Sequence, residues 1–509
     1  MLSKFKNNTF FIGAFILTIS GIATRLIGFF FRIFLSKSLG AASLGLYQLV
    51  LPIATFGFAV SGFGIQTAIS RYVAANPSHQ KGSSPVQRII LCQGCIISLF
   101  LSLPLMFLIY ENAGFLSTFI FKEPALIHLI RIISIQIPIS SLHCCISGYF
   151  IGRKNTAVPG FSQIIEQLSR VAITIVFWKH CITFNQTFSP ALVIWGAILG
   201  EAFSVFFCFL MFFFERKSPI HQAKKDSSFY SPLLKLSVPV TLNRVFLTVL
   251  TSIEAILIPY TLKLYGLSNV KALSLYGIFS GMTFTFILFP SSIIQSVSTV
   301  LMPEVAELSS AKKEKNLEKT VSATLFFSVS MGIFFNGLFA TYGGSLSAFL
   351  FHEPLCARYV KILSLLCPFM YLNMNIASIL HGLERTILPF LINVSGTVVK
   401  ISALLLFVPK YGMNGYFFGF LISTILESCF YFYFLKKEIS FPFSFQEWIF
   451  YPAFDTLSCV ALTYFCKRII LFFYPSFSSV ILYLFLCAIE SILFFLFTLY
   501  RNRDKIRTH

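Results

Sequence analysis

The stretch FFIGAFILTISGIATRLIGFFFRIFL, residues 10 to 35, decides which class of fold this sequence can adopt. A helix needs about 20 apolar residues to cross a bilayer, and this stretch supplies them with only two charges, Arg25 and Arg32. It is also too long to be the apolar region of a signal peptide, which is about 7–15 residues. The stretch therefore predicts a transmembrane helix.

The composition extends this prediction to the whole chain. Of 509 residues, 56% are hydrophobic and 11% are charged, whereas soluble proteins carry about 25% charged residues. That excludes a soluble enzyme, a disordered protein and a secreted disulfide scaffold. Roughly fourteen apolar stretches of about 22 residues each would use about 300 residues. We predict an all-α polytopic membrane protein with about 14 transmembrane helices, over residues 10–35, 44–73, 87–110, 125–151, 160–180, 190–214, 232–261, 271–301, 318–341, 356–382, 387–408, 412–435, 447–469 and 473–500.

The net charge of +20 is better explained by the orientation of the chain in the membrane than by binding to nucleic acid. The basic residues are scattered through short loops and form no continuous stripe, so no nucleic-acid partner is expected. With the N-terminus placed in the cytoplasm, roughly 22 of the 39 Lys and Arg residues fall on the inner side and roughly 10 on the outer side. This bias predicts a multi-pass plasma-membrane protein with both termini in the cytoplasm.

The sequence lacks the motifs typical of metal binding and of ATP hydrolysis. The twelve cysteines lie mostly in apolar stretches, and the C-x-x-C of Cys92 and Cys95 has no second pair. The eight histidines show no metal-ligand spacing, and no P-loop is present. We therefore expect no metal, no cofactor and no ATP hydrolysis, and a secondary transporter or facilitator rather than an enzyme.

An internal repeat divides the chain. Gly152-Arg-Lys-Asn-Thr-Ala-Val-Pro159 matches Gly382-Leu-Glu-Arg-Thr-Ile-Leu-Pro389 about 230 residues later, and Gln66 matches Gln295. Six spans separate the partners, so both copies run in the same direction and form a parallel repeat. The predicted domains are an N-terminal lobe of six spans (1–215), a cytoplasmic linker (216–231), a C-terminal lobe of six spans (232–436), and two additional helices with a basic cytoplasmic tail (437–509).

The first span carries the best substrate candidates. Thr18, Gly21, Arg25, Gly28 and Arg32 follow one another at intervals of three and four residues, which places them on one helical face. A charge deep in the bilayer must face protein or water, so Arg25 is expected to line a cavity between the lobes. Arg32 lies nearer the interface, where snorkelling is an equally good explanation.

Arg244, in the equivalent seventh span, is the other cavity candidate. Two guanidinium groups facing one cleft would suit a phosphate or diphosphate.

Three carboxylates within spans are candidates for coupling transport to an ion: Glu166, Glu201 and Glu254. Glu166 has a simpler explanation, because Arg170 lies four residues later on the same helix face. Gln66 and Gln295 are expected to join helices by hydrogen bonds rather than to touch substrate.

Several stretches together resemble the stage V sporulation protein B family. They are residues 24–35, 45–49, 67–74, 252–259, 272–277, 288–290 and 301–307. That family belongs to the multidrug/oligosaccharidyl-lipid/polysaccharide (MOP) exporter superfamily of flippases. The resemblance implies two six-helix lobes, related to multidrug exporters in fold, and alternating access around a central cavity.

The resemblance also implies a substrate: a polyprenyl-diphosphate-linked saccharide, either a peptidoglycan precursor for the spore cortex or a related polysaccharide unit. Membrane lipids and cell-wall synthesis enzymes become candidate partners. When the chain is aligned with lipid II flippases through Arg25 and Gly28, their second arginine falls on Phe31 instead of Arg32. Two alternatives stay open: a multidrug or cation antiporter, and a membrane-embedded glycosyltransferase or polymerase.

Overall fold

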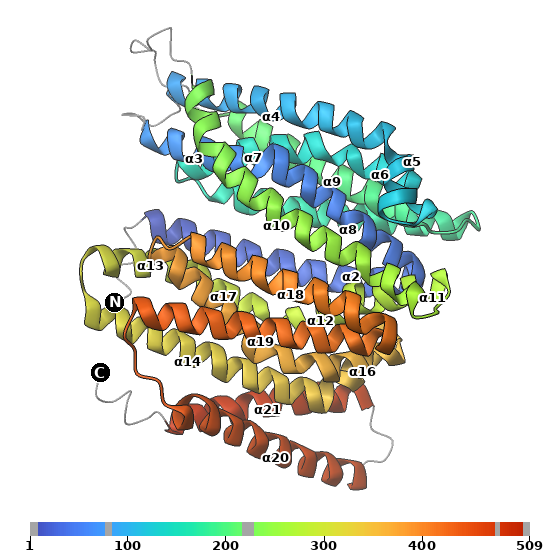
Figure 1. The fold of residues 1–509 in the computed structure, drawn as a ribbon, viewed down its shortest axis with the longest axis vertical. Coiled ribbons are helices and arrows are strands. Elements are labelled where there is room, and N and C mark those ends of the chain that lie inside the picture. Colours follow the sequence, from blue (N-terminus) through green and yellow to red (C-terminus); the bar gives the residue numbers. More distant parts are fainter. Residues whose placement is uncertain (1–8, 77–83, 216–228, 474–478, 502–509) are drawn as a thin grey trace. The chain divides into compact units, whose positions relative to one another are not determined.

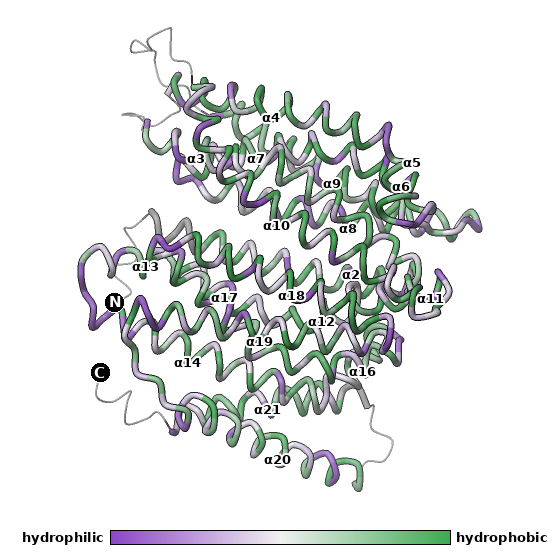
Figure 2. The backbone as a smooth tube through the Cα atoms, viewed as in Figure 1, coloured by the Kyte–Doolittle hydropathy of each residue, from purple (hydrophilic) through white to green (hydrophobic). Residues whose placement is uncertain are grey.

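The computed structural model describes residues 9–76, 84–215, 229–473 and 479–501, and all regular secondary structure in these ranges is helical (Figure 1). Among these described residues, eleven helical runs are long and apolar enough to cross a membrane. Hydrophobic residues dominate these helices, and many hydrophilic residues lie at their connections (Figure 2). The chain divides into two compact units, Met1–Gly277 and Ile278–His509.

The first unit is built around a long, broken helix. Its elements are α2 (Thr9–Phe58), η1 (Ala59–Phe63), α3 (Gly64–Ala75), α4 (Pro85–Glu111), α5 (Ala113–Phe115), η2 (Leu116–Ile120), η3 (Pro124–Leu126), α6 (Ile127–Ser134), α7 (Gln136–Gly152), α8 (Ala157–Thr183), α9 (Pro190–Phe213), α10 (Tyr230–Leu264) and α11 (Asn269–Gly277).

The second unit holds the remaining helices. They are η4 (Ile278–Thr283), α12 (Phe284–Leu288), α13 (Ser291–Ser310), α14 (Glu314–Leu338), η5 (Phe339–Gly343), α15 (Gly344–Phe351), α16 (Pro354–Leu363), η6 (Ser364–Leu366), α17 (Cys367–Gly382), α18 (Ile387–Tyr411), α19 (Met413–Glu438), η7 (Gln446–Phe450), α20 (Tyr451–Phe473) and α21 (Ser479–Arg501).

The all-α polytopic fold class is confirmed, and each of the fourteen predicted spans is helical over most of its length. Two of these spans share the run Ile16–Ala75, and α8 and α21 occupy two more without belonging to the eleven apolar runs. In α8 the charges of Glu166, Arg170 and Lys179 reduce the apolar character. Most of the predicted linker and most of the basic tail lie outside the described residues, and the predicted lobe boundaries stay a prediction.

The first two predicted spans are separated by a backbone break at Gly40. This residue has φ 74° and ψ 167°, which is not a helical conformation. A positive φ of this kind is open to glycine and strained for residues with a side chain. The break therefore lets the chain reverse between the two halves of α2.

Close glycine contacts hold α8 against α9. A Cβ atom on Gly200 would lie 2.8 Å from the carbonyl oxygen of Glu166 and 2.9 Å from the backbone nitrogen of Arg170. Only a residue without a side chain allows the two backbones to approach this closely. The contact brings the carboxylates of α8 and α9 to the same level.

The two predicted repeat turns share their local geometry. Lys154 and Glu384 both adopt positive φ, 61° and 62°. A Cβ atom on Gly152 would lie 2.5 Å from the carbonyl oxygen of Ser70, and one on Gly382 would lie 2.6 Å from that of Met302. Each glycine thus lets its helix end against a neighbour in its own unit, which supports the predicted repeat.

Candidate functional site

Arg25 lies on the face of α2 that also carries Gly21 and Gly28, which we call the open strip. Its side chain is exposed, and within the described part of the chain no hydrogen bond or ion pair involves it. A Cβ atom on Gly21 or on Gly28 would meet nothing within 4 Å, so space is open one turn before and one turn after the guanidinium. Two turns before Arg25, the hydroxyl of Thr18 is buried without a hydrogen-bond partner. Arg25 thus presents a cation without a partner beside open space, whereas the Thr18 hydroxyl lies inside the protein.

The other two predicted arginines are placed differently. Arg32 is half-buried and makes contacts of its own. Arg244 is exposed on α10, with its guanidinium carbon 5.1 Å from the centroid of the Phe63 ring. Both Arg25 and Arg244 belong to the first unit, and no described contact joins them. Their predicted convergence on one phosphate stays a prediction.

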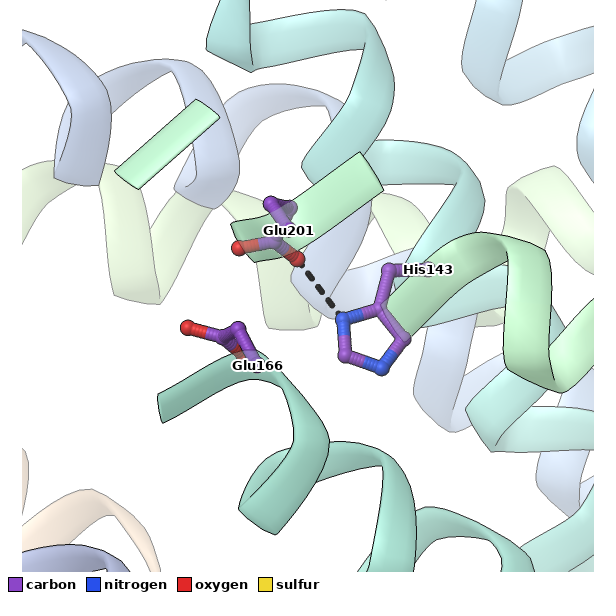
Figure 3. A group of neighbouring side chains, drawn as sticks. All are labelled: His143, Glu166 and Glu201. Atoms are coloured by element: carbon purple, nitrogen blue, oxygen red, sulfur yellow. Dashed lines mark hydrogen bonds and ion pairs between the residues drawn. The ribbon is translucent and has the colours of Figure 1, made fainter. Parts of the chain in front are cut away.

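A buried polar network joins α7, α8 and α9. Nδ1 of His143 lies 2.7 Å from Oε1 of Glu201, and Nη2 of Arg170 donates to Oε1 of Glu166 at 2.5 Å. Figure 3 shows the two glutamates and the imidazole converging from separate helices. The ion pair that the spacing of Glu166 and Arg170 predicts is confirmed.

The neighbours of His143 are compatible with a doubly protonated imidazole ring. Its Nε2 lies 3.1 Å from the hydroxyl oxygens of Ser162 and Ser204. Both hydroxyls donate their protons to backbone carbonyls, Ser162 to that of Pro159 and Ser204 to that of Ser162, each at 2.9 Å. Each hydroxyl therefore faces Nε2 as an acceptor, and the carboxylate faces Nδ1 as an acceptor. An imidazolium with both nitrogens protonated satisfies all of these contacts.

This network also explains why we do not interpret the cluster as a metal centre. One ligand atom each from His143, Glu166 and Glu201 lies within 4.8 Å of the others, which is close enough to hold a cation. With Arg170 and a protonated His143, however, two positive groups already balance two carboxylates. A divalent ion would leave this buried region with excess charge and would compete with Arg170 for Glu166.

The remaining candidates lie apart from this network. Glu254 is buried on α10 and makes contacts of its own. Gln66 and Gln295 are half-buried on α3 and α13. Pro159 and Pro389 are buried, and each backbone carbonyl accepts a hydrogen bond, from Ser162 in the first case and from Tyr431 in the second.

Sequence reasoning missed His143 as a partner of Glu201. No histidine has a metal-ligand spacing, and the partners of His143 (Ser162, Glu201 and Ser204) lie on two other helices, α8 and α9. The positions of His143 and Glu201 inside apolar spans could nonetheless have indicated the pair. An ionisable residue inside an apolar span needs a partner, and both the fourth and the sixth predicted span contain one.

Comparison with known proteins fits this architecture. The model of the family described as "Polysaccharide biosynthesis protein" matches residues 11–309, so the chain belongs to this family, and the "MatE" family model matches residues 245–406. The chain is thus a multi-pass membrane protein of the polysaccharide biosynthesis family.

Among individual relatives, stage V sporulation protein B of Bacillus subtilis (strain 168) is 23% identical over 417 residues, which cover 80% of each chain. The resemblance found in the sequence is therefore confirmed. Lipid II flippase MurJ of the same organism is 24% identical over 172 residues, which cover 31% of this chain and 30% of that one.

Two solved structures share the fold. Lipid II flippase MurJ in an inward closed conformation matches with a TM-score of 0.68 and 16% identity, over 96% of this chain and 99% of that one. An inward-facing multidrug resistance MATE family transporter of the MOP superfamily matches with a TM-score of 0.66 and 14% identity, over 84% and 98%.

Removing the imidazole tests whether the buried network holds the first unit together. His143→Ala strands the carboxylate of Glu201 in a buried site, and a hydrogen bond to a charged group contributes about 1.5–3 kcal/mol. We expect a clear fall in melting temperature in detergent solution. The matched control is His128→Ala, which removes an exposed histidine and should leave melting unchanged. Equal melting of the two variants would show that the network does not stabilise the fold.

Proposed function

We propose that this protein translocates a saccharide linked to a polyprenyl diphosphate across the plasma membrane by alternating access. Its family is described as polysaccharide biosynthesis, and its fold is shared with a lipid II flippase. The saccharide and diphosphate would cross through the protein while the polyprenyl tail stays in the bilayer. The substrate we favour is a peptidoglycan precursor for the spore cortex, or a related polysaccharide unit, on the similarity to stage V sporulation protein B.

The observation that carries this proposal is the unpaired guanidinium of Arg25. A charged side chain at the centre of a bilayer costs at least about 2.5–3.5 kcal/mol. Arg170 offsets that cost through Glu166, but no described residue does the same for Arg25. An anionic substrate group in the open strip beside Gly21 and Gly28 would supply the missing charge.

The same observation separates the proposal from its closest rival. A multidrug antiporter of the MATE type shares the fold, but its cationic substrates would be repelled by Arg25. Transport is also distinguished from glycosyl transfer, because transport leaves the substrate chemically unchanged.

We further propose Glu201 as a coupling group, with Glu166 and Glu254 as the other candidates. The network of His143, Arg170, Glu166 and Glu201 is neutral when it holds one exchangeable proton, which lies on His143 when both glutamates are ionised. Loss of that proton would leave a net negative charge inside the first unit, and such an imbalance can shift a conformational equilibrium. We also propose that both termini lie in the cytoplasm, on the bias of Lys and Arg residues.

Translocation can be measured with purified protein in liposomes. A labelled lipid-linked saccharide placed in one leaflet should become accessible in the other, and its mass should stay the same. An imposed proton gradient should change the rate in wild type but not in Glu201→Gln. A product of altered mass that forms only with active protein would contradict transport and support an enzyme.

Substrate binding tests the role of Arg25. Each charge-assisted contact to phosphate is worth about 1.5–3 kcal/mol, so Arg25→Ala should weaken binding by about one to two decades. Arg25→Lys should retain part of the affinity, because the charge survives while the two-pronged geometry is lost. Binding of a polyprenyl-diphosphate saccharide and thermal stability are measured on the same purified variants.

Arg131→Ala is the matched control, since it removes another exposed arginine, stacked 5.5 Å over Tyr110. It should leave binding unchanged. If Arg25→Ala melts early yet binds normally once folded, Arg25 has a structural role and the phosphate-site hypothesis is wrong.

A further inference from the structure

Glu490 lies at the middle of α21, the helix that occupies the last predicted span. Eleven residues of helix separate it from each end of α21, about 16 Å at 1.5 Å per residue. Its side chain is fully buried, and both of its carboxyl oxygens lack a hydrogen-bond partner within the described residues. Neither the proposed translocation nor the network of the first unit uses this group.

The polar side chain beside Glu490 offers no proton to a carboxylate. Thr463 of α20 lies next to the carboxyl group. Its hydroxyl donates to the backbone carbonyls of Cys459 and Val460, at 2.9 and 3.1 Å. An ionised Glu490 would therefore find no donor here. A neutral carboxyl group carries its own proton, and the Thr463 oxygen is left to face it as an acceptor.

The titratable groups around Glu490 supply no positive charge. The helices α20, α14 and α15 pack against α21. On the side of α14 the contact is apolar, because Phe334 stacks on Phe494 with ring centroids 4.6 Å apart, and α15 has no titratable side chain. The remaining neighbours are one phenol and three thiols: Tyr342 from η5, Cys459 and Cys466 from α20, and Cys487 from α21.

The charged residues nearer the ends of these two helices have partners of their own. Asp455 pairs with Arg501 at 2.7 Å, and Nζ of Lys467 donates to the hydroxyl of Tyr483 at 3.3 Å. No ion pair among the described residues includes Glu490. A charge that is buried without compensation is so unfavourable that the group takes the neutral form instead. The structure therefore favours a protonated Glu490.

A pocket of about 370 Å³ leads to the surroundings of this carboxyl group. Tyr342 of η5 and Tyr464 of α20 are among the residues that line it. The hydroxyl of Tyr342 lies next to Thr463, which in turn lies next to Glu490. Two hydroxyl groups thus connect the pocket with the carboxyl group, and a hydroxyl can pass a proton because it is both a donor and an acceptor.

We propose that Glu490 is a proton-binding site inside the membrane, which holds one proton in the folded protein and exchanges it with the pocket through Tyr342 and Thr463. The site is separate from the network of His143 and Glu201, because it belongs to the second unit. Loss of the proton would leave an uncompensated charge where α20 and α21 pack together. The packing of these two additional helices therefore depends on one proton.

Infrared spectroscopy of the full-length protein in lipid vesicles detects this proton directly, because neutral carboxyl groups and carboxylates absorb at different frequencies. At neutral pH, the spectrum of wild type minus that of Glu490→Gln should contain the C=O band of one neutral carboxyl group. Glu490→Asp keeps a carboxyl group and should move this band rather than remove it. A carboxylate band in the difference spectrum at neutral pH would overturn the proposal.

Transfer into D₂O tests the route, because the carboxyl band moves to lower frequency as deuterium replaces the proton. Tyr342→Phe should slow this change by about two- to tenfold, the factor that one ordinary hydrogen bond is worth. Tyr464→Phe is the matched control, since it removes another tyrosine hydroxyl from the lining of the same pocket, one that accepts from Arg468. It should leave the rate unchanged. Equal rates in wild type and Tyr342→Phe would contradict the route.

Thermal melting in detergent solution tests the consequence for packing. The fold holds the neutral form, so the stability that depends on it is present at low pH and is lost as the pH rises. Over the pH range in which the infrared band disappears, the melting temperature of wild type should fall more than that of Glu490→Gln, which cannot ionise. An equal fall in the two proteins would show that the packing does not depend on this proton.

Discussion

The structure depends on one constraint: a charge inside a bilayer must face a partner or water, because hydrocarbon cannot solvate it. The first unit meets this constraint by pairing Arg170 with Glu166 and His143 with Glu201, on helices held together by close glycine contacts. Arg25 is the exception among these charges, because no described residue compensates it and it must face water or a ligand instead. The proposed function follows from that exception, since the compensating charge can arrive with an anionic substrate.

The paired and the unpaired charges have different physical consequences. Removing one member of a buried pair leaves the other uncompensated, which destabilises the fold. Removing an unpaired guanidinium relieves a cost and lowers affinity only for the group that it binds. Replacing a residue of a buried pair should therefore lower the stability of the fold, whereas replacing Arg25 should lower substrate affinity, even though both kinds of residue lie within apolar helices.

The sequence predicted the features that depend on local pattern. Apolar length located the helices, spacing on one helix predicted the Glu166–Arg170 pair, and the repeated Gly and Pro residues located two turns of matching geometry. It did not predict the contacts that need three helices to meet. His143, Ser162 and Ser204 come from α7, α8 and α9, and no spacing along the chain brings them together.

The most direct test of the central claim asks whether position 25 meets water and substrate. Arg25→Cys is made in a chain whose exposed and half-buried cysteines (Cys92, Cys95, Cys429, Cys466 and Cys487) are serines. A charged, impermeant thiol reagent is then applied to each side of sealed vesicles, with and without a polyprenyl-diphosphate saccharide. Our account predicts that the cysteine reacts, and that the substrate slows the reaction. Leu26→Cys, one residue away on α2 and turned by about 100°, should show no such protection. A cysteine at position 25 that reacts from neither side, or whose reaction the substrate leaves unchanged, would contradict the account.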